Sequence, residues 1–425
     1  MNRIVIVGLI VVVACAGSES GPGGTPSAAP GGAAVTADII VLRAGGVLDG
    51  RGEHLGARDI VVRDGRIAEI APAGQGSGAT IYELAGITLL PGLIDTHVHI
   101  GWHFDRTGRT SSRDVGETAE EAILYGAENA WITLTSGVTT VQSLGSAADA
   151  ELRAAIGRGV LPGPRILTSL GQISGGRNAT PEQLRERVAQ LAERGADVIK
   201  VFASESIRTG GAPTLSQEQL DALCGEARAR GLRAVVHAHG PESAARTAQA
   251  GCTTVEHGAL LDRPTLELLA ERGLFFDPNI DLIFRNYFEN QERFIGIGSY
   301  TEEGFEQMRL AVPAALQVFQ EALSVPGLRV VFGTDAVAGA HGRNYQELVY
   351  RSQVGGQPPM ETIVSATSLA AESLGMADEI GAIALGLAAD IIGTAGDPSG
   401  DVEALGRVRF VMKGGRVYRN EPAQR

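Results

Sequence analysis

Eight short apolar segments, separated by amphipathic helical segments, run from about residue 91 to about residue 376 and constrain the fold more than any other feature. A closed barrel of parallel strands needs this number of alternating units. We therefore expect an α/β chain in which 91–376 forms a (β/α)8 TIM-type barrel. The expected strands lie at 94–99, 138–144, 165–171, 198–204, 234–239, 253–257, 274–278 and 330–335.

Two of the helical segments carry clear start signals. Thr180 followed by Pro181 predicts a helix N-terminus, and Gly195 predicts the end of that helix. Ser216, with Gln219 three residues later, has the pattern of a capping box and predicts a second start. The barrel prediction therefore rests on helices as well as on strands.

The two flanks of the barrel region have strand and turn patterns instead. Asp64 and Gly65 join two apolar-rich runs in the first flank, and Gly414 and Gly415 join two runs in the second. Such dipeptides favour two-residue hairpin turns. We expect residues 37–90 and 377–425 to form one small β-sandwich domain together.

The N-terminal residues have the pattern of an export signal. Residues 1–15 hold one basic residue and then an apolar run of signal-peptide length, too short to span a membrane. The run ends in VVAC, which resembles a bacterial lipobox, so Cys15 is the predicted lipidation site; the alternative is an ordinary cleaved signal. Residues 16–36, rich in Gly, Ser, Pro and Ala, predict a flexible linker. We expect a periplasmic or cell-surface lipoprotein of a bacterium that meets the membrane only through its lipid.

Charge and cysteine content exclude two other classes of protein. The formal net charge of −13 is spread along the chain without a basic block that could follow a phosphate backbone, so nucleic acid is not an expected partner. Cys224 and Cys252 lack the close paired spacing of a zinc ribbon or a disulfide-rich miniprotein. We therefore expect that sulfur does not organise this fold.

Histidines cluster where the predicted strands end. His97 and His99 lie two residues apart on the first strand, so both side chains face the same way. Barrel enzymes place their active sites at the C-terminal ends of the strands, where residues distant in sequence meet. The pair is thus predicted to bind one metal ion together.

The ordered segments PGLIDTHVHI, VIKVFAS, VVHAHG, TVEHG, VVFGTDA and IGAIALGLAADII resemble the amidohydrolase superfamily, in the branch of imidazolonepropionase-like proteins and prolidase-like dipeptidases. The resemblance covers residues 37–418. It implies two divalent metal ions, zinc being the expected element. It also implies six metal ligands, which are His97, His99, Lys200, His237, His257 and Asp335.

Lys200 decides between a binuclear and a simpler site. A protonated ammonium cannot ligate a cation, so a lysine in a metal site must be neutral or modified. In similar enzymes this lysine is carboxylated by CO2, and the carbamate bridges the metals; the alternative is a solvated or charge-paired lysine. The resemblance implies that a metal-bridging hydroxide attacks the substrate, and that Asp335 relays its proton to the leaving amine.

Five further residues are candidate substrate contacts. Their positions after strand ends place them near the expected barrel mouth, but packing or surface roles are the alternatives. The segment 281–319 is either an ordinary helix with its loop or a lid over the substrate. The five candidates are His103, Arg177, His239, His341 and Arg343.

The expected function is hydrolysis of an amide bond, in a dipeptide or an N-acyl amino acid. The alternative enzyme is a cyclic-amide hydrolase of imidazolone type with one metal. The alternative from another class is a non-catalytic surface lipoprotein, whose ligand set should be broken; no ligand is missing here. The sequence leaves open whether the chain forms a homo-oligomer.

Overall fold

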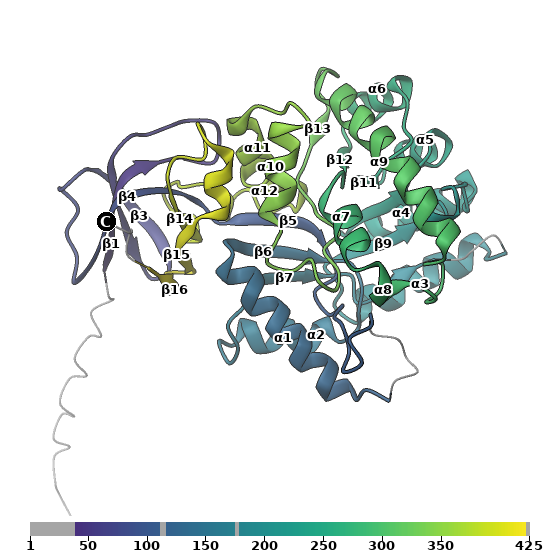
Figure 1. Cartoon of the computed structure of the whole chain (residues 1–425), viewed down its shortest axis with the longest axis horizontal. Coiled ribbons are helices and arrows are strands. Elements are labelled where there is room, and N and C mark those ends of the chain that lie inside the picture. The colour runs from purple at the N-terminus through teal and green to yellow at the C-terminus, as the bar shows by residue number, and fades with distance from the viewer. Residues whose placement is uncertain (1–38, 111–115, 175–177, 422–425) are drawn as a thin grey trace, which may run out of the picture. The chain divides into compact units, whose positions relative to one another are not determined.

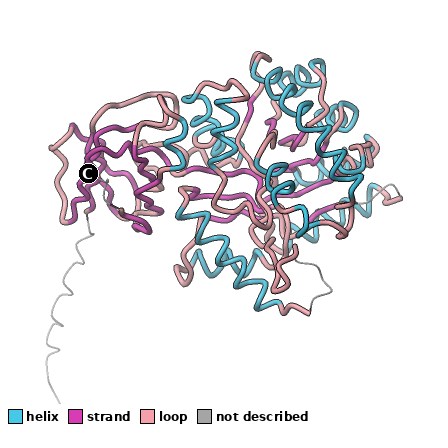
Figure 2. The backbone as a smooth tube through the Cα atoms, viewed as in Figure 1, coloured by secondary structure: helices cyan, strands magenta, loops and turns pink. Residues whose placement is uncertain are grey.

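Eight parallel strands with helices around them occupy the middle of the chain, as the alternating pattern predicts (Figures 1 and 2). The computed structural model describes residues 39–110, 116–174 and 178–421. Cys15 and Arg177 lie outside these ranges. The strands are β5 (Leu93–Val98), β6 (Val138–Ser143), β7 (Arg165–Thr168), β9 (Val198–Phe202), β10 (Arg233–Ala238), β11 (Thr254–His257), β12 (Phe275–Asp277) and β13 (Arg329–Val330).

Backbone hydrogen bonds close these strands into the predicted barrel. β5, β6 and β7 pair in one parallel sheet, and β8 (Gln172–Ile173) to β13 pair in a second, with β8 continuing the line of β7. The first and eighth strands are joined by Thr96 N, which donates to Phe332 O at 3.0 Å, and by His99 N, which donates to Ala336 O at 2.8 Å. The residues after β13 therefore lie against the end of β5.

Capping residues fix where the barrel helices start. The side chains of Thr180 and Ser216 each accept a hydrogen bond from the backbone three residues on, so both predicted N-termini are confirmed. None of the helices in the described ranges is both long and apolar enough to cross a membrane. The helices are α1 (Ala119–Thr135), α2 (Asp149–Gly157), α3 (Pro181–Glu193), η1 (Ile207–Thr209), α4 (Gln217–Ala229), α5 (Pro241–Gln249), α6 (Arg263–Glu271), α7 (Leu282–Glu289), α8 (Gln291–Phe294), α9 (Glu302–Leu323), α10 (Tyr345–Gln353), α11 (Pro359–Ser365), α12 (Ser368–Ser373) and η2 (Val402–Gly406).

The two flanks of the barrel pair into one mixed sheet, in the order β16-β15-β14-β4-β1-β2-β3. Figure 1 shows its early strands in purple and its late strands in yellow, and β4 pairs directly with β14. Ile60 and Ile67, on the neighbouring strands β2 and β3, share one apolar core with Phe410 on β15, near the other end of this order, as a sandwich requires. The strands are β1 (Ile40–Val47), β2 (Arg58–Arg63), β3 (Arg66–Pro72), β4 (Thr80–Pro91), β14 (Ile391–Ala395), β15 (Val408–Lys413) and β16 (Arg416–Asn420).

The two predicted hairpin turns lie against each other in this sheet. Asp64 and Gly65 have φ of 51° and 74°, and Gly414 and Gly415 have φ of 56° and 77°, the left-handed region that two-residue hairpins need. A Cβ on Gly65 would lie 2.7 Å from the carbonyl oxygen of Gly414. Glycine at this position therefore permits the contact between the two ends of the chain.

A disulfide corrects the expectation from cysteine spacing. Cys224 on α4 is bonded to Cys252, which precedes β11, with Cα atoms 5.2 Å apart. The spacing of 28 residues is not that of a local motif, so only the fold brings the two sulfurs together. The bridge joins helix α4 to the start of strand β11.

The segment after β12 is an ordered helical cover. It contains α7, α8 and α9, and the rings of Tyr287, Phe294 and Tyr300 pack together with centroids 5.0 to 5.2 Å apart. All three rings are buried. Residues 281–319 thus form ordered helices.

The double substitution Cys224→Ala with Cys252→Ala should lower the free energy of unfolding by about 3 kcal/mol, because the bridge constrains the unfolded chain. The measurement is the denaturant midpoint under oxidising conditions. Wild-type protein treated with reductant is the matched control and should shift by a similar amount. An unchanged midpoint in both samples would show that the bridge does not form.

Candidate metal centre

The six predicted ligands converge at the C-terminal ends of the barrel strands. They lie on or directly after β5, β9, β10 and β11 and in the loop after β13, and all six line one cavity. Lys200 Nζ lies 3.3 Å from His97 Nε2. Asp335 Oδ1 lies 3.4 Å from His97 Nε2 and 3.0 Å from His99 Nε2. Lys200 is therefore inside the cluster and not on the surface.

The remaining two predicted ligands, His237 and His257, lie close to His97. The ring centroids of His97 and His257 are 5.1 Å apart, and those of His237 and His257 are 4.6 Å apart. Ligand atoms of His97, His257 and Asp335 all lie within 4.8 Å of one another. This spacing fits donors around a cation, and the donor set of imidazole nitrogens and carboxylate oxygen suits zinc and similar divalent metals.

The contacts of His237 and His97 indicate which of their ring nitrogens face the site. Nε2 of His237 lies 3.2 Å from the carbonyl oxygen of Glu205, which can only accept, so Nε2 donates and Nδ1 keeps its lone pair. Nδ1 of His97 lies 2.7 Å from Glu256 Oε2, which leaves His97 Nε2 facing Lys200 and Asp335. In the neutral rings, both free nitrogens are lone-pair donors of the kind a metal requires.

Burial lowers the pKa of four basic side chains of the site. Burial, reinforced by neighbouring positive groups, lowers the pKa of His97, His237 and His257 well below the usual value. Burial also lowers the pKa of Lys200, although Glu256 and Asp335 oppose the shift. A metal ligand must present a lone pair, so neutral imidazoles and a less basic lysine fit metal binding.

Asp335 is the one strongly acidic group among the six ligands. Burial alone would raise its pKa, but His97 and His99 outweigh burial and lower the pKa of Asp335 to about 2. The carboxylate is therefore ionised at neutral pH. Its negative charge lies next to the imidazole lone pairs, and a cation bound between them would neutralise it.

The backbone is strained at two of these ligands. His257 and Asp335 have φ of 67° and 52°, which non-glycine residues seldom adopt, and Leu170, where the third barrel strand breaks, has φ of 53°. Such conformations persist only where the surrounding structure enforces them, and they concentrate at functional sites. The strain turns the side chains of both ligands into the cavity.

Two buried carboxylates behind the ligands were not predicted from the sequence. Glu256 contacts His97, and Asp277 accepts a hydrogen bond from the Thr96 hydroxyl at 2.7 Å. Burial raises the pKa of Glu256 to about 7 and raises that of Asp277 as well. Their signal in the sequence is a single acidic residue within an apolar strand, in TTVEH and LFFDP.

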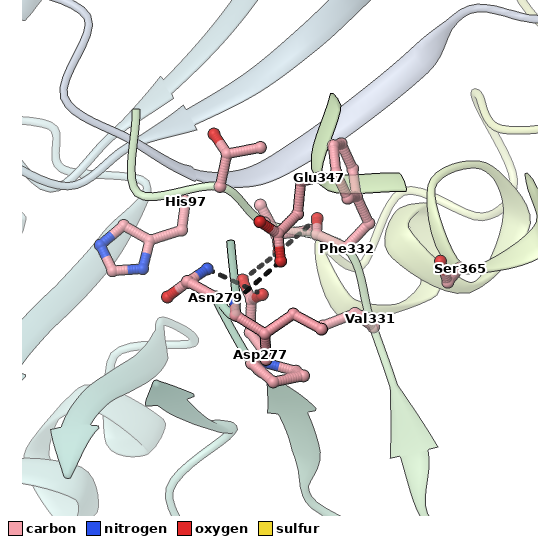
Figure 3. A network of polar contacts seen from close by, with 12 residues as sticks. His97, Asp277, Asn279, Val331, Phe332, Glu347 and Ser365 are labelled. Atoms are coloured by element: carbon pink, nitrogen blue, oxygen red, sulfur yellow. Dashed lines mark hydrogen bonds between the residues drawn. The ribbon is translucent and has the colours of Figure 1, made fainter. Parts of the chain in front are cut away.

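A fully buried ion network supports this layer (Figure 3). Arg351 Nη2 lies 3.7 Å from Asp277 Oδ1, and Arg351 Nε lies 3.3 Å from Glu347 Oε1. Glu347 in turn accepts hydrogen bonds from the backbone nitrogens of Ile280, Asp281 and Leu282, at 2.7 to 3.0 Å. The network thus connects the start of α7 to Asp277 in the barrel core.

The five predicted substrate contacts divide into three groups. His239 lines the cavity, whereas His103, His341 and Arg343 are not among its lining residues and bind neighbouring groups instead. His103 Nε2 lies 2.9 Å from Glu117, His341 Nε2 donates to the Trp102 carbonyl at 3.1 Å, and Arg343 pairs with Glu289 at 2.8 Å. Arg177 falls outside the described residues.

The cavity walls include residues that sequence reasoning missed. The helical cover contributes Tyr287 and Tyr300, so the segment 281–319 does line the cavity. Arg208, on η1 after β9, lines it as well, and no pattern in its stretch SESIRTG marked it. The other walls are largely apolar and include Phe202, Ile207, Ile283, Phe284 and Met308.

A family comparison agrees with this geometry. The model of the amidohydrolase family matches residues 88–418, which is most of the chain. The chain belongs to the amidohydrolase family. It is thus an amide-bond hydrolase that acts on carbon–nitrogen bonds, and the resemblance predicted from its motifs is confirmed.

Individual relatives of this amidohydrolase are named for different activities. Ochratoxinase from Aspergillus niger is 25% identical over 435 residues, 90% of this chain and 87% of the relative. Imidazolonepropionase from Saccharopolyspora erythraea is 28% identical over 168 residues, 39% of each chain. A Xaa-Pro dipeptidase structure with methionine bound in the active site superposes with a TM-score of 0.81 and 29% identity, covering 90% of this chain and all of that one.

Removing divalent metal from this amidohydrolase should lower its melting temperature, because ions that bind only the folded site stabilise it by about 3 kcal/mol at a hundredfold excess over Kd. Calorimetry before and after chelation, and after zinc is restored, measures the shift. The control is a variant with both His99→Ala and His237→Ala, whose melting temperature should not respond to zinc. An equal response in that variant would place the metal elsewhere.

Proposed function

We propose that this amidohydrolase hydrolyses the amide bond of a dipeptide or an N-acyl amino acid at a site for two divalent metal ions, with zinc as the expected metal. The observation that carries the proposal is the position of Lys200, buried and 3.3 Å from His97 among the other predicted ligands. A lysine held there needs a reason, because its ammonium form would repel cations.

Carboxylation of Lys200 supplies that reason. An unprotonated amine is the form that reacts with CO2, and burial lowers the pKa of Lys200 towards that form. The carbamate would carry a negative charge and two oxygens, which can bridge two cations. His97, His99 and Asp335 would hold one ion, and His237 and His257 the other.

The side chains of the site then divide the remaining tasks. Bound divalent ions supply Lewis acidity, which polarises a substrate carbonyl and lowers the pKa of water. Asp335 is ionised and can take a proton from the attacking water and deliver it to the leaving amine. His239, whose pKa burial lowers to about 3, is a neutral hydrogen-bond donor available to the carbonyl oxygen.

The cavity and the relatives support the substrate class. Apolar walls such as Phe284 and Met308 suit an amino-acid side chain or an acyl group. The dipeptidase relative at 29% identity binds an amino acid, methionine, in its active site. A cyclic-amide hydrolase with one metal would have no use for a lysine among its ligands, and a non-catalytic binding protein would not be expected to keep all six.

We also propose that the protein is exported and anchored by a lipid on Cys15. The VVAC motif and the Gly- and Pro-rich stretch after it support this proposal. The Cys224–Cys252 disulfide supports it independently, because disulfides persist mainly in oxidising compartments.

Lys200→Ala should reduce bound metal from about two ions per chain to one or fewer and abolish turnover, since the bridging group is lost. Elemental analysis and hydrolysis of a dipeptide and N-acyl amino acid panel measure the two effects. Lys413→Ala, on β15 of the sandwich, is the matched control and should keep its metal. Wild-type metal content and rate in Lys200→Ala would remove the binuclear mechanism.

Cys15→Ser should move the protein from the membrane fraction to the soluble fraction in its bacterial host, because no acyl chain can be attached. Immunoblotting of fractionated cells and labelling with a fatty-acid analogue measure the change. Cys224→Ser is the control and should leave the membrane association as it is. Unaltered fractionation and no label in the wild type would count against the anchor.

A further inference from the structure

Arg208 is the only arginine among the described residues that line the cavity. It lies on η1, and the Ser206 side chain caps this turn by accepting a hydrogen bond from Arg208 N. The residue is partly buried. Among the described residues it makes no ion pair with a carboxylate, which is unusual for a cation in an apolar-walled cavity.

Neutral groups of the helical cover hold the guanidinium in place. Nε donates to Ser299 Oγ at 2.9 Å, and the guanidinium carbon lies 4.1 Å from the ring centroid of Tyr300. The Tyr300 hydroxyl donates to the Tyr287 hydroxyl at 3.0 Å, which ties the two rings together. These contacts orient the guanidinium, but within the described ranges no carboxylate pairs with its charge.

The turn that carries Arg208 lies next to His239. Arg208 and His239 line the same cavity. Gly211, three residues further along the same turn, packs against His239 so closely that a Cβ there would lie 2.9 Å from the His239 Cβ. The turn that carries Arg208 is therefore anchored beside a residue proposed to contact the scissile carbonyl.

We propose that Arg208 binds the free α-carboxylate of the substrate, so that the enzyme cleaves the last amide bond before a C-terminal carboxylate. The inference rests on the proposed function. A carboxylate in a dipeptide or N-acyl amino acid is separated from the scissile carbonyl by only the amide nitrogen and the α-carbon. A planar guanidinium can hold such a group through two parallel hydrogen bonds.

The competing role for Arg208 is to brace the helical cover through Ser299 and Tyr300. Both roles predict that a substitution harms the enzyme, but they differ in which ligands are affected. A brace supports every ligand equally, whereas a carboxylate contact is lost only with ligands that carry the carboxylate. Paired acid and amide ligands therefore separate the two roles.

The experiment compares N-acetyl-L-leucine with N-acetyl-L-leucinamide as substrates, and L-leucine with L-leucinamide as ligands in titration calorimetry. Metal-loaded wild-type enzyme, Arg208→Met and Arg208→Lys are tested. Arg343→Met is the matched control, because that arginine pairs with Glu289 and does not line the cavity. Metal content and melting temperature are recorded for each variant.

We expect Arg208→Met to lower kcat/KM for the acid and the affinity for leucine by about 30-fold or more, the loss typical of a broken charged pair. The kcat/KM for the amide, the affinity for leucinamide and the metal content should change little. Arg208→Lys should give values between those of the wild type and Arg208→Met. Equal losses with acid and amide would assign Arg208 to bracing. Wild-type affinity for leucine no greater than for leucinamide would overturn the inference even if amides are hydrolysed. Failure to hydrolyse either substrate, with leucine still preferred in the wild type and not in Arg208→Met, would reject the proposed function alone.

Discussion

The closure of the barrel between its first and last strands is the contact on which the site depends. The backbone nitrogen of Asp335 donates to the carbonyl oxygen of His97 at 2.7 Å, and the Thr334 hydroxyl donates to Asp95 at 2.7 Å. These bonds join residues more than 230 positions apart and hold Asp335 in its left-handed conformation beside His97 and His99. Without this closure the carboxylate and the imidazoles would not meet.

Around that contact, buried charges are arranged in layers. Imidazoles, lysine and Asp335 face the cavity, Glu256 and Asp277 stand behind them, and Arg351 with Glu347 stands behind Asp277. The Arg351 guanidinium lies between the carboxyl groups of Asp277 and Glu347, which offsets the cost of burying its charge. The outermost pair also caps the backbone at the start of α7, so one network supports both the ligands and the cover of the cavity.

The substrate side of the cavity belongs to less regular parts of the chain. The walls come from the turn after β9 and from the helical cover, which contribute aromatic rings, aliphatic side chains and one arginine. Relatives of one barrel can thus act on different amides, because these segments can vary while the strand ends keep the ligands. Because the wall segments can vary among relatives, membership of the family establishes the type of bond that is cleaved, whereas the substrate depends on the cavity walls.

The sequence by itself determined the eight strands and both hairpin turns, because strand periodicity and glycine turns are local properties. The six side chains predicted as ligands came from the resemblance to amidohydrolases, and in the structure all six line one cavity. It did not reveal the Cys224–Cys252 bridge, the buried Glu256 and Asp277, or Arg208. These features depend on contacts between side chains of different helices and strands, and such contacts cannot be predicted from strand spacing. Only the closed barrel and its helical cover decided that Arg343 points to Glu289 while Arg208 faces the cavity.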